Sequence, residues 1–271
     1  MKIFRCLAFS SLLAMSVLSA SAQDFDKGWA AYEAGDFQAA LKEFLPMAEG
    51  GDASAQYYIG WMYRNGNGVT QSDAEGAKWI RLAADQGLAS AQISIGFMYE
   101  NGKGVVQNDA EAVKWYRLAA DQDDAVAQSN LGTMYENGKG VVQNDAEAVK
   151  WYRLAADQGY AKAQYKLATM YDSGEGVIKY DVEAVKWYRL AADQGHAKAQ
   201  SILGLAYGAG IGVIQSNVMA HMWLNIASAN GEENSAVLRE EIAAKMTREE
   251  IDKAQAMAQE CMDSGYKNCG D

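Results

Sequence analysis

The side chains that could carry out acid–base, nucleophilic or metal chemistry are few, apart from the carboxylates. The chain has two histidines, His196 and His221, and three cysteines, Cys6, Cys261 and Cys269. Catalysis would need a nucleophile beside a base, paired carboxylates in a cleft, or a cluster of metal ligands. The motifs His-Glu-x-x-His, Gly-x-Ser-x-Gly and Cys-x-x-Cys do not occur. The sequence therefore predicts no catalytic residue, no metal site and no cofactor.

Glycine pairs of the form Gly-x-Gly-Val, as in residues 66–69 and 102–105, share part of the pattern of a phosphate-binding loop. Such a loop also needs a preceding strand and either Lys-Ser/Thr or a third glycine. Gly208, Gly210 and Gly212 do form a Gly-x-Gly-x-Gly, for which phosphate binding is the minor alternative. We interpret these glycines as turn residues that permit positive φ, with the valine packed inward.

The charge balance excludes one class of partner. The chain holds 24 Lys and Arg against 35 Asp and Glu, a formal net charge of −11. Phosphate backbones attract clustered basic residues, so we expect no binding to nucleic acid. The acid excess either keeps the protein soluble or steers it toward a basic partner.

Residues 1–22 have the pattern of a secretory signal peptide. Lys2 and Arg5 charge the start, an apolar run covers residues 6–18, and the small residues 20–22 offer a cleavage site. A short membrane anchor is the alternative, but the run is shorter than the ~20 residues that cross a bilayer. Cleavage would remove Lys2 and Arg5 and bring the net charge to −13. We expect a periplasmic or secreted protein without membrane insertion.

Cys261 and Cys269 would be the cysteines left after cleavage. In an oxidising compartment we expect them to form a disulfide that ties down the C-terminal tail. Two free thiols or half of a metal site are the alternatives, and no histidine lies near them in sequence to support the latter.

A period of 36 residues organises most of the chain. Five units occupy residues 53–88, 89–124, 125–160, 161–196 and 197–232, and each opens with Ala-x-Ala-Gln. One glutamine, one tyrosine and one tryptophan recur in register, the tryptophans being Trp79, Trp115, Trp151, Trp187 and Trp223. A fixed period of this length is typical of stacked structural repeats.

Each unit divides into two amphipathic helical halves. In residues 53–65, Ala55, Ile59 and Met62 share one face, and in residues 109–122 so do Ala112, Trp115 and Ala119. Asn108 lies three residues before Glu111, the spacing of a capping box. Small residues let the helices approach closely while one tryptophan per unit fills the remaining space, so we expect all five tryptophans in the core.

These motifs resemble Sel1-like repeats, bacterial relatives of tetratricopeptide repeats. The resemblance rests on Ala-x-Ala-Gln-x-x-Leu-Gly-x-Met-Tyr-x-x-Gly-x-Gly-Val, then Asp-x-x-x-Ala-x-x-Trp-Tyr, and residues 125–160 match nearly throughout. It implies an all-α, right-handed α-solenoid of stacked helix-turn-helix repeats. Residues 23–52 resemble a shortened entry repeat, and residues 233–271 resemble capping helices with a disulfide-tied tail.

The resemblance also implies a binding surface on the concave face, lined by the first helices. The candidate partner-binding residues hold non-repeated positions of those helices: Tyr57, Trp61, Arg64, Ile93, Phe97 and Tyr165. The same positions elsewhere hold Glu100, Ser129, Thr133, Glu136, Thr169, Asp172, Ser201, Leu205 and Gly208. Trp61 and Phe97 either anchor a partner or pack on the entry repeat.

The sequence therefore favours an exported interaction scaffold that binds a peptide or protein and is not an enzyme. One alternative is a cell-wall or β-lactam-related hydrolase. It follows only from a branch of the family that carries a disulfide in every repeat, whereas no repeat here contains a cysteine. The other alternative is a structural component of an envelope assembly.

Overall fold

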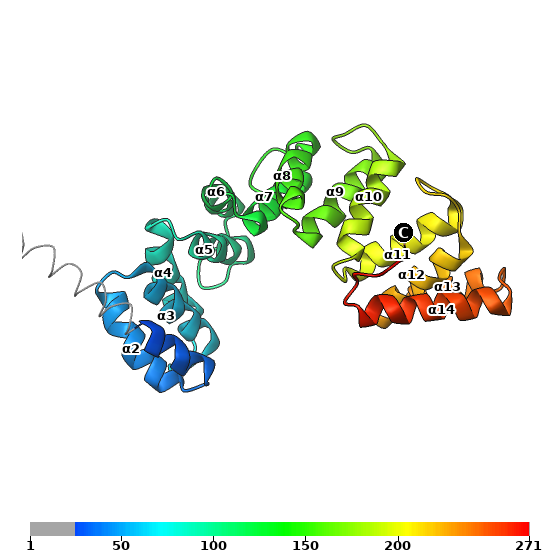
Figure 1. Ribbon diagram of the computed structural model, residues 1–271. Coiled ribbons are helices and arrows are strands. Elements are labelled where there is room, and N and C mark those ends of the chain that lie inside the picture. The colour runs from blue at the N-terminus through cyan, green and yellow to red at the C-terminus, as the bar shows by residue number, and fades with distance from the viewer. Residues whose placement is uncertain (1–24, 271) are drawn as a thin grey trace, which may run out of the picture. The chain divides into compact units, whose positions relative to one another are not determined.

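The computed structural model describes residues 25–270, and every regular element in that range is a helix (Figure 1). A helical segment at residues 25–33 precedes α2. The helices that follow are α2 (Phe37–Glu49), α3 (Ala53–Asn65), α4 (Asp73–Asp85), α5 (Ala89–Asn101), α6 (Asp109–Ala120), α7 (Ala125–Asn137), α8 (Asp145–Asp157), α9 (Ala161–Ser173), α10 (Asp181–Ala192), α11 (Ala197–Ala209), α12 (Asn217–Ala229), α13 (Ser235–Ala243) and α14 (Arg248–Asp263). The predicted all-α class is confirmed. The predicted signal peptide and Cys6 lie outside the described residues.

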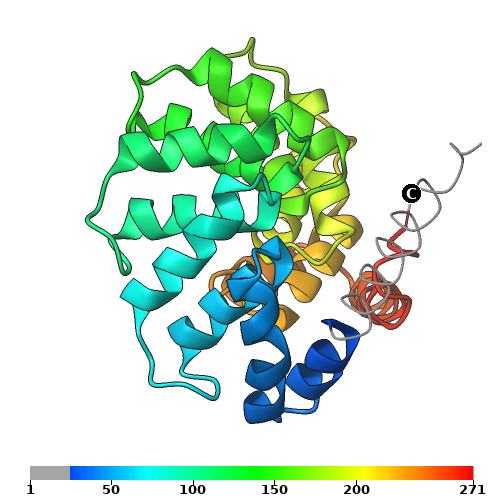
Figure 2. The ribbon, with the colours of Figure 1, turned by 90° about the vertical axis from the view of Figure 1, so that its left-hand side faces the viewer.

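The chain divides into two compact units after Gln122. In the first unit α3 packs on α4 and α5 on α6; in the second, α7 packs on α8, α9 on α10 and α11 on α12 (Figure 2). Each pair corresponds to one 36-residue repeat. The helix-turn-helix repeat predicted from the period is therefore the building block of both units. None of the described helices combines the length and the apolar character that a bilayer crossing requires.

The glycine turns end the first helices. Gly66, Gly102, Gly138, Gly174 and Gly210 are C-caps in the left-handed region. The second glycine of the motif has another role, because it allows a close backbone approach. A Cβ atom on Gly104 would lie 2.1 Å from the carbonyl oxygen of Asp73, at the start of α4. The motif thus fixes how one repeat stacks on the preceding one.

The second helices begin at the predicted caps, although the boxes are only half formed. The side chain of Asn108 accepts a hydrogen bond from the backbone N–H of Glu111, as predicted. The Glu111 carboxylate instead pairs with Lys114, at 2.5 Å. A complete capping box occurs at Thr247 and Glu250, at the start of α14.

The repeat tryptophans are not equally buried. Trp115, Trp187 and Trp223 are 7%, 5% and 0% exposed, whereas Trp79 and Trp151 are half-buried. The prediction that all five lie in the core is therefore right for three. Arginine covers part of the rings of Trp115 and Trp223: the guanidinium carbon of Arg81 lies 5.5 Å from the Trp115 ring centroid, and that of Arg189 lies 5.1 Å from the Trp223 centroid.

The repeated glutamine joins the two helices of each repeat. Gln92 is buried in α5 and donates to the carbonyl oxygen of Ala84 at 3.2 Å. Its own side-chain oxygen accepts from Gln122 at 2.8 Å. The same bond, at the same distance, joins Gln86 to Gln56, Gln158 to Gln128, Gln194 to Gln164 and Asn230 to Gln200. A buried amide that is fully bonded in this way holds the register of the pair.

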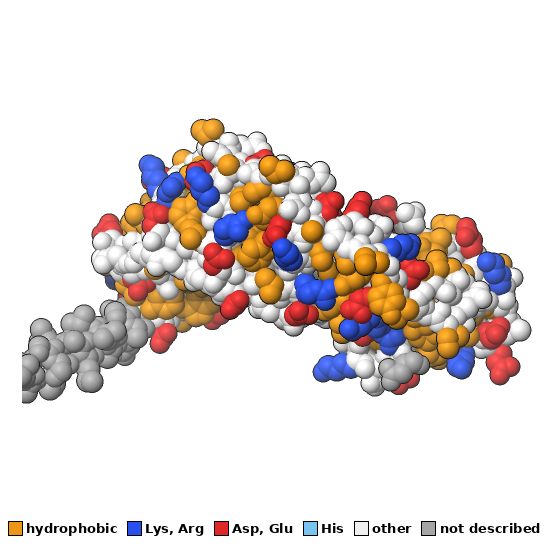
Figure 3. All heavy atoms as spheres, turned by 90° about the horizontal axis from the view of Figure 1, so that it is seen from above, with side chains coloured by type: hydrophobic (Ala, Val, Ile, Leu, Met, Phe, Trp, Pro, Cys, Tyr) orange, Lys and Arg blue, Asp and Glu red, His pale blue; other side chains and the backbone are white. Residues whose placement is uncertain are grey.

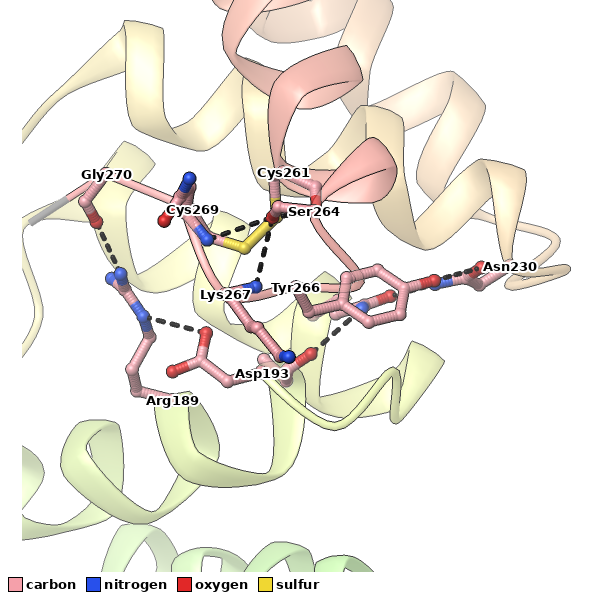
Figure 4. Close-up of a disulfide and its surroundings, with 12 residues drawn as sticks. Arg189, Asp193, Asn230, Cys261, Ser264, Tyr266, Lys267, Cys269 and Gly270 are labelled. Carbon is pink, nitrogen blue, oxygen red and sulfur yellow. Dashed lines mark hydrogen bonds and ion pairs between the residues drawn. A yellow bond between two sulfur atoms is a disulfide. The ribbon is translucent and has the colours of Figure 1, made fainter.

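The C-terminal tail is fastened to the last repeats of the second unit. The Sγ atoms of Cys261 and Cys269 are bonded, and both residues are buried (Figure 4). Arg189 in α10 donates to the carbonyl oxygen of Gly270, and the Tyr266 hydroxyl donates to the side-chain oxygen of Asn230 at 3.0 Å. The tail therefore contacts α10 and the residue that follows α12.

Candidate partner-binding surface

The first helix of the first repeat presents an aromatic group with a cation on it. The guanidinium carbon of Arg64 lies 4.9 Å from the Trp61 ring centroid, and Tyr57 meets the same ring edge-on at 6.2 Å. A Cβ atom on Gly76 would lie 2.5 Å from the Arg64 side chain. The later repeats have alanine at that position, so this glycine makes the room that Arg64 occupies.

The helices before the first repeat, residues 25–33 and α2, pack on a different aromatic residue of α3. Tyr58 stacks on Phe44 at 5.6 Å and contacts Trp29 at 5.1 Å. The ring contacts of Trp61 are those with Tyr57 and Arg64 of its own helix, and the ring stays half-buried. The sequence analysis missed Tyr58, because this position varies freely in the later repeats, as Ser94, Asn130, Lys166 and Ile202, and its packing on Trp29 and Phe44 leaves no periodic signal.

The next first helix, α5, exposes Phe97. Its side chain is 41% exposed, and the ammonium nitrogen of Lys103 lies 5.7 Å from the ring centroid. Ile93, one turn earlier, is half-buried. Trp61 and Phe97 hold the same position in successive repeats of the first unit, so this unit presents aromatic side chains beside cations at two adjacent steps.

In the second unit the position shared by Tyr57 and Tyr165 is half-buried or buried, whereas Leu205, at the position of Phe97, is 43% exposed. Tyr165 is half-buried and stacks on His196 with ring centroids 4.5 Å apart. Ser129 and Ser201, which share its position, are 0% and 7% exposed. The Ser201 hydroxyl accepts a bond from Ser235 at the start of α13. The two serines therefore lie inside the unit, and Tyr165 is the residue at this position that stays half-buried.

The carboxylates of the first helices bind buried tyrosines. Tyr116 donates to Glu100 at 2.9 Å, and Tyr152 donates to Glu136 at 2.5 Å. Burial, together with the neighbouring carboxylate, raises the pKa of both tyrosines. Lys166 also pairs with Glu136, at 2.9 Å. Carboxylates engaged in this way fix the first helix on the second.

The two histidines are not placed for catalysis with one another. His196 caps α11 through a bond from the backbone N–H of Ala199 and stacks on Tyr165. His221 is 2% exposed in α12, and burial lowers its pKa. Within residues 25–270 no three His, Cys, Asp or Glu side chains form a group that could hold a metal ion.

The turns expose aliphatic residues that the sequence analysis did not single out. Val106, Val142 and Ile178 are each 88% exposed, and Ile214 is 91% exposed. Each directly follows the valine of the glycine motif. The sequence analysis considered only that valine and not the residue after it. Figure 3 shows one face of the molecule, on which hydrophobic side chains are scattered among acidic and basic ones.

A known protein family matches the chain with the same repeat limits as the five units. The family model for the Sel1 repeat matches residues 53–88, 89–124, 125–160, 161–196 and 197–232. These matches span more than half of the chain. The chain belongs to the Sel1 repeat family.

Two solved structures resemble it over most of its length. One is c5321, a protective antigen of uropathogenic Escherichia coli strains with an SLR fold: 30% identity and a TM-score of 0.82, over 96% of this chain and 57% of c5321. The other is a Sel1 repeat protein from Oxalobacter formigenes: 33% identity and a TM-score of 0.75, over 88% of this chain and 99% of that protein. The chain thus spans little more than half the length of c5321. A search of curated proteins finds no match.

Proposed function

We propose that this protein is an interaction scaffold whose first helices bind a peptide or protein partner, on the face that the repeat pattern predicts to be concave. The observation that carries the proposal is Phe97, a large aromatic residue left 41% exposed beside Lys103. Trp61 with Arg64 supports it from the preceding repeat. Aromatic residues and arginine are the side chains most enriched among the energetic centres of interfaces.

The partner residues of this proposal are Tyr57, Trp61, Arg64, Ile93 and Phe97 in the first unit, with Tyr165 in the second. Of these, Trp61 and Phe97 supply most of the binding energy, because aromatic rings bury large areas with little loss of side-chain freedom. Tyr57 and Arg64 hold the Trp61 ring in place. The scaffold carries out no catalytic step in this proposal.

A capture experiment tests the proposal. The mature chain with Trp61→Ala and Phe97→Ala should lose a partner that the unchanged chain retains from an extract of its own cells. The matched control is Leu82→Ala with Leu118→Ala, since these leucines of the second helices α4 and α6 are 48% and 47% exposed. If the aromatic variant retains every partner, the proposal is wrong. Turnover of nitrocefin or muropeptides by the mature chain would contradict the absence of catalysis.

Export belongs to the same proposal. Residues 1–22 form a signal peptide, residues 23–52 an entry repeat and residues 233–271 the cap of the last repeat. The charged, apolar and small segments of the N-terminus support export, as does the buried disulfide of the tail, because such bonds persist in oxidising compartments. A mature mass beginning at Gln23 in the periplasmic or extracellular fraction is expected; an uncleaved chain in the cytosol would refute export.

A further inference from the structure

An apolar pocket lies in the second unit between α9, α10 and α11. Its volume is about 360 Å³, at the lower end of the ~300–1,000 Å³ typical of ligand pockets. Buried Val185 and Tyr188 contribute to its lining from α10. Leu205 and Ile211 also line it and are 43% and 49% exposed. The pocket is thus open to solvent and lined mainly by carbon.

The pocket coincides with a departure from the repeat at a single interior position. Four repeats have a methionine there, Met62, Met98, Met134 and Met170, and each is 0% or 1% exposed. The fifth repeat has Ala206, which lines the pocket. A methionine side chain fills the space that an alanine leaves open. The missing side chain therefore accounts for room at this position that the other repeats fill.

The residues at the rim of the pocket are also more apolar than those at the same positions of other repeats. Ile211 stands where the second and third repeats have Lys103 and Lys139. Ile202 stands where the fourth repeat has Lys166, the partner of Glu136. The fourth repeat, directly before this one, has the charged residues Glu175 and Lys166 at the positions of Ile211 and Ile202, so two isoleucines extend the apolar lining to the surface.

The same change leaves an acidic group at the pocket without a lysine. Asp172 lines the pocket and holds the repeat position of Glu136. Glu136 pairs with Lys166, whereas the corresponding residue near Asp172 is Ile202. Asp172 lies beside Tyr188, whose pKa is raised by burial together with this carboxylate, and among the described residues no Lys or Arg forms an ion pair with Asp172. Asp181 adds a second carboxylate to the lining, 3.5 Å from Lys179. The pocket therefore combines an apolar interior with acidic groups.

We propose that this pocket binds an apolar side chain of a partner peptide whose neighbouring Lys or Arg pairs with Asp172. The inference rests on the proposed scaffold function and names the chemistry of a partner in the second unit. Charge complementarity selects this occupant, because a carboxylate beside an apolar cavity favours a cation attached to a hydrophobic group. The net charge of −11 steers a basic segment in the same direction.

The experiment titrates the full mature chain, labelled with ¹⁵N, with the hexapeptide Gly-Ser-Leu-Lys-Ser-Gly. The expected result is a set of shift changes at residues 202–211. Replacing Leu by Ser, or Lys by Glu, should weaken binding about tenfold, since each exchange removes one of the two recognised groups. No binding by the Leu-Lys peptide, or equal binding by the Leu-Glu peptide, would overturn the proposal.

Variants locate the binding. Ala206→Met restores the side chain of the other four repeats. By filling the pocket, it should lower the affinity for the Leu-Lys peptide about tenfold or more. Ile211→Lys changes only an exposed rim residue, so it tests the same site without risk to folding. The new lysine repels the lysine of the peptide, and the affinity should fall severalfold. Asp172→Asn should abolish the preference for Lys over Glu beside the leucine. Asp157→Asn, an exposed carboxylate at the end of α8, is the control and should change nothing.

The outcomes separate this inference from the proposed function. Unchanged binding by both Ala206→Met and Ile211→Lys refutes the pocket, even if Trp61→Ala with Phe97→Ala still loses a partner from the extract. Peptide binding that needs the pocket, together with an aromatic variant that keeps every partner, refutes the aromatic surface instead. Binding of octylammonium with no binding of the peptide would indicate a small amphiphile and would contradict the peptide proposal.

Discussion

The second and third repeats differ in a short part of their first helices and are identical over a long stretch. Residues 98–122 and 134–158 have the same sequence, and they repeat the same contacts: Lys114 with Glu111 and Lys150 with Glu147, each at 2.5 Å. The first helices differ where Phe97 is replaced by Thr133. Phe97 is exposed, whereas the Thr133 hydroxyl bonds to Tyr152 at 3.0 Å.

The two repeats indicate which part of a repeat is free to change in sequence. Contacts inside the identical stretch set the caps, the turn and the packing of the two helices, so a copy of the sequence produces a copy of the structure. Apart from the last two residues of each repeat, the differing residues lie on the first helix, where one choice leaves an aromatic ring in solvent and another closes a hydrogen bond. Binding properties can therefore vary from repeat to repeat on a constant scaffold.

The largest expected effect compares the same tryptophan in the two identical stretches. Trp115→Ala should lower the free energy of unfolding of its unit by ~3–5 kcal/mol, because the ring is 7% exposed. Trp151→Ala should cost less, since that ring is less completely buried. Urea unfolding followed by circular dichroism measures both. Equal losses would break the link between burial and stability on which the comparison depends.

A smaller effect is expected in the glycine turn of the second repeat. Gly104→Ala should cost ~3 kcal/mol, because the new Cβ atom meets the carbonyl of Asp73 and the backbone is left-handed, with φ at +72°. Gly87→Ala has a similar strain at φ +93° but open space around it, and should cost only ~1 kcal/mol. Thermal unfolding measures both variants. If they unfold at the same temperature, the close approach between repeats at Gly104 does not contribute to stability.

The interior glutamine should have an intermediate effect. Gln92→Ala removes the donor to the Ala84 carbonyl and the acceptor for Gln122, and should cost ~1–3 kcal/mol because two interior hydrogen bonds are lost together. Gln107→Ala removes a single exposed bond to the carbonyl of Glu100 and should cost under ~0.5 kcal/mol. Thermal unfolding of the two variants compares the stability lost with the interior hydrogen bonds of Gln92 and with the surface bond of Gln107. A loss for Gln107→Ala as large as that for Gln92→Ala would contradict this expectation.

The smallest stability effect is expected on the first-helix surface. Phe97→Thr, which gives the second repeat the residue of the third, should change the free energy of unfolding by less than ~0.5 kcal/mol, because the ring is exposed. The same variant should lose the partner captured by the unchanged chain. A large loss of stability would mean that Phe97 belongs to the scaffold, and the distinction between the two parts of the repeat would fail.

The repeat limits, the helix pairs and the turns could be predicted from the sequence because each leaves a periodic signal. The burial of individual residues could not. Trp115 and Trp151 are the same residue in the same stretch, yet one is buried and the other half-buried. Burial depends on what packs from neighbouring helices, and a repeat register does not contain that information.

The candidate site was predictable in part for the same reason. Position along the first helix located Phe97 and Trp61, but the same rule placed Ser129 and Ser201 on the surface, and both are buried. Small hydroxyl residues at that position turn inward, where the larger Tyr57 and Tyr165 remain half-buried. The pocket at Ala206 was also missed, because an alanine in place of methionine resembles ordinary decay of a terminal repeat.

The most direct measurement of the central claim places a photocrosslinking benzoylphenylalanine at position 97, and separately at position 118, in cells that make the protein. Phe97 and Leu118 are similarly exposed, at 41% and 47%, on a first helix and on a second helix of the same repeat. The account predicts a discrete crosslinked partner from position 97 and none from position 118. A partner crosslinked from position 118 but not from position 97 would contradict it.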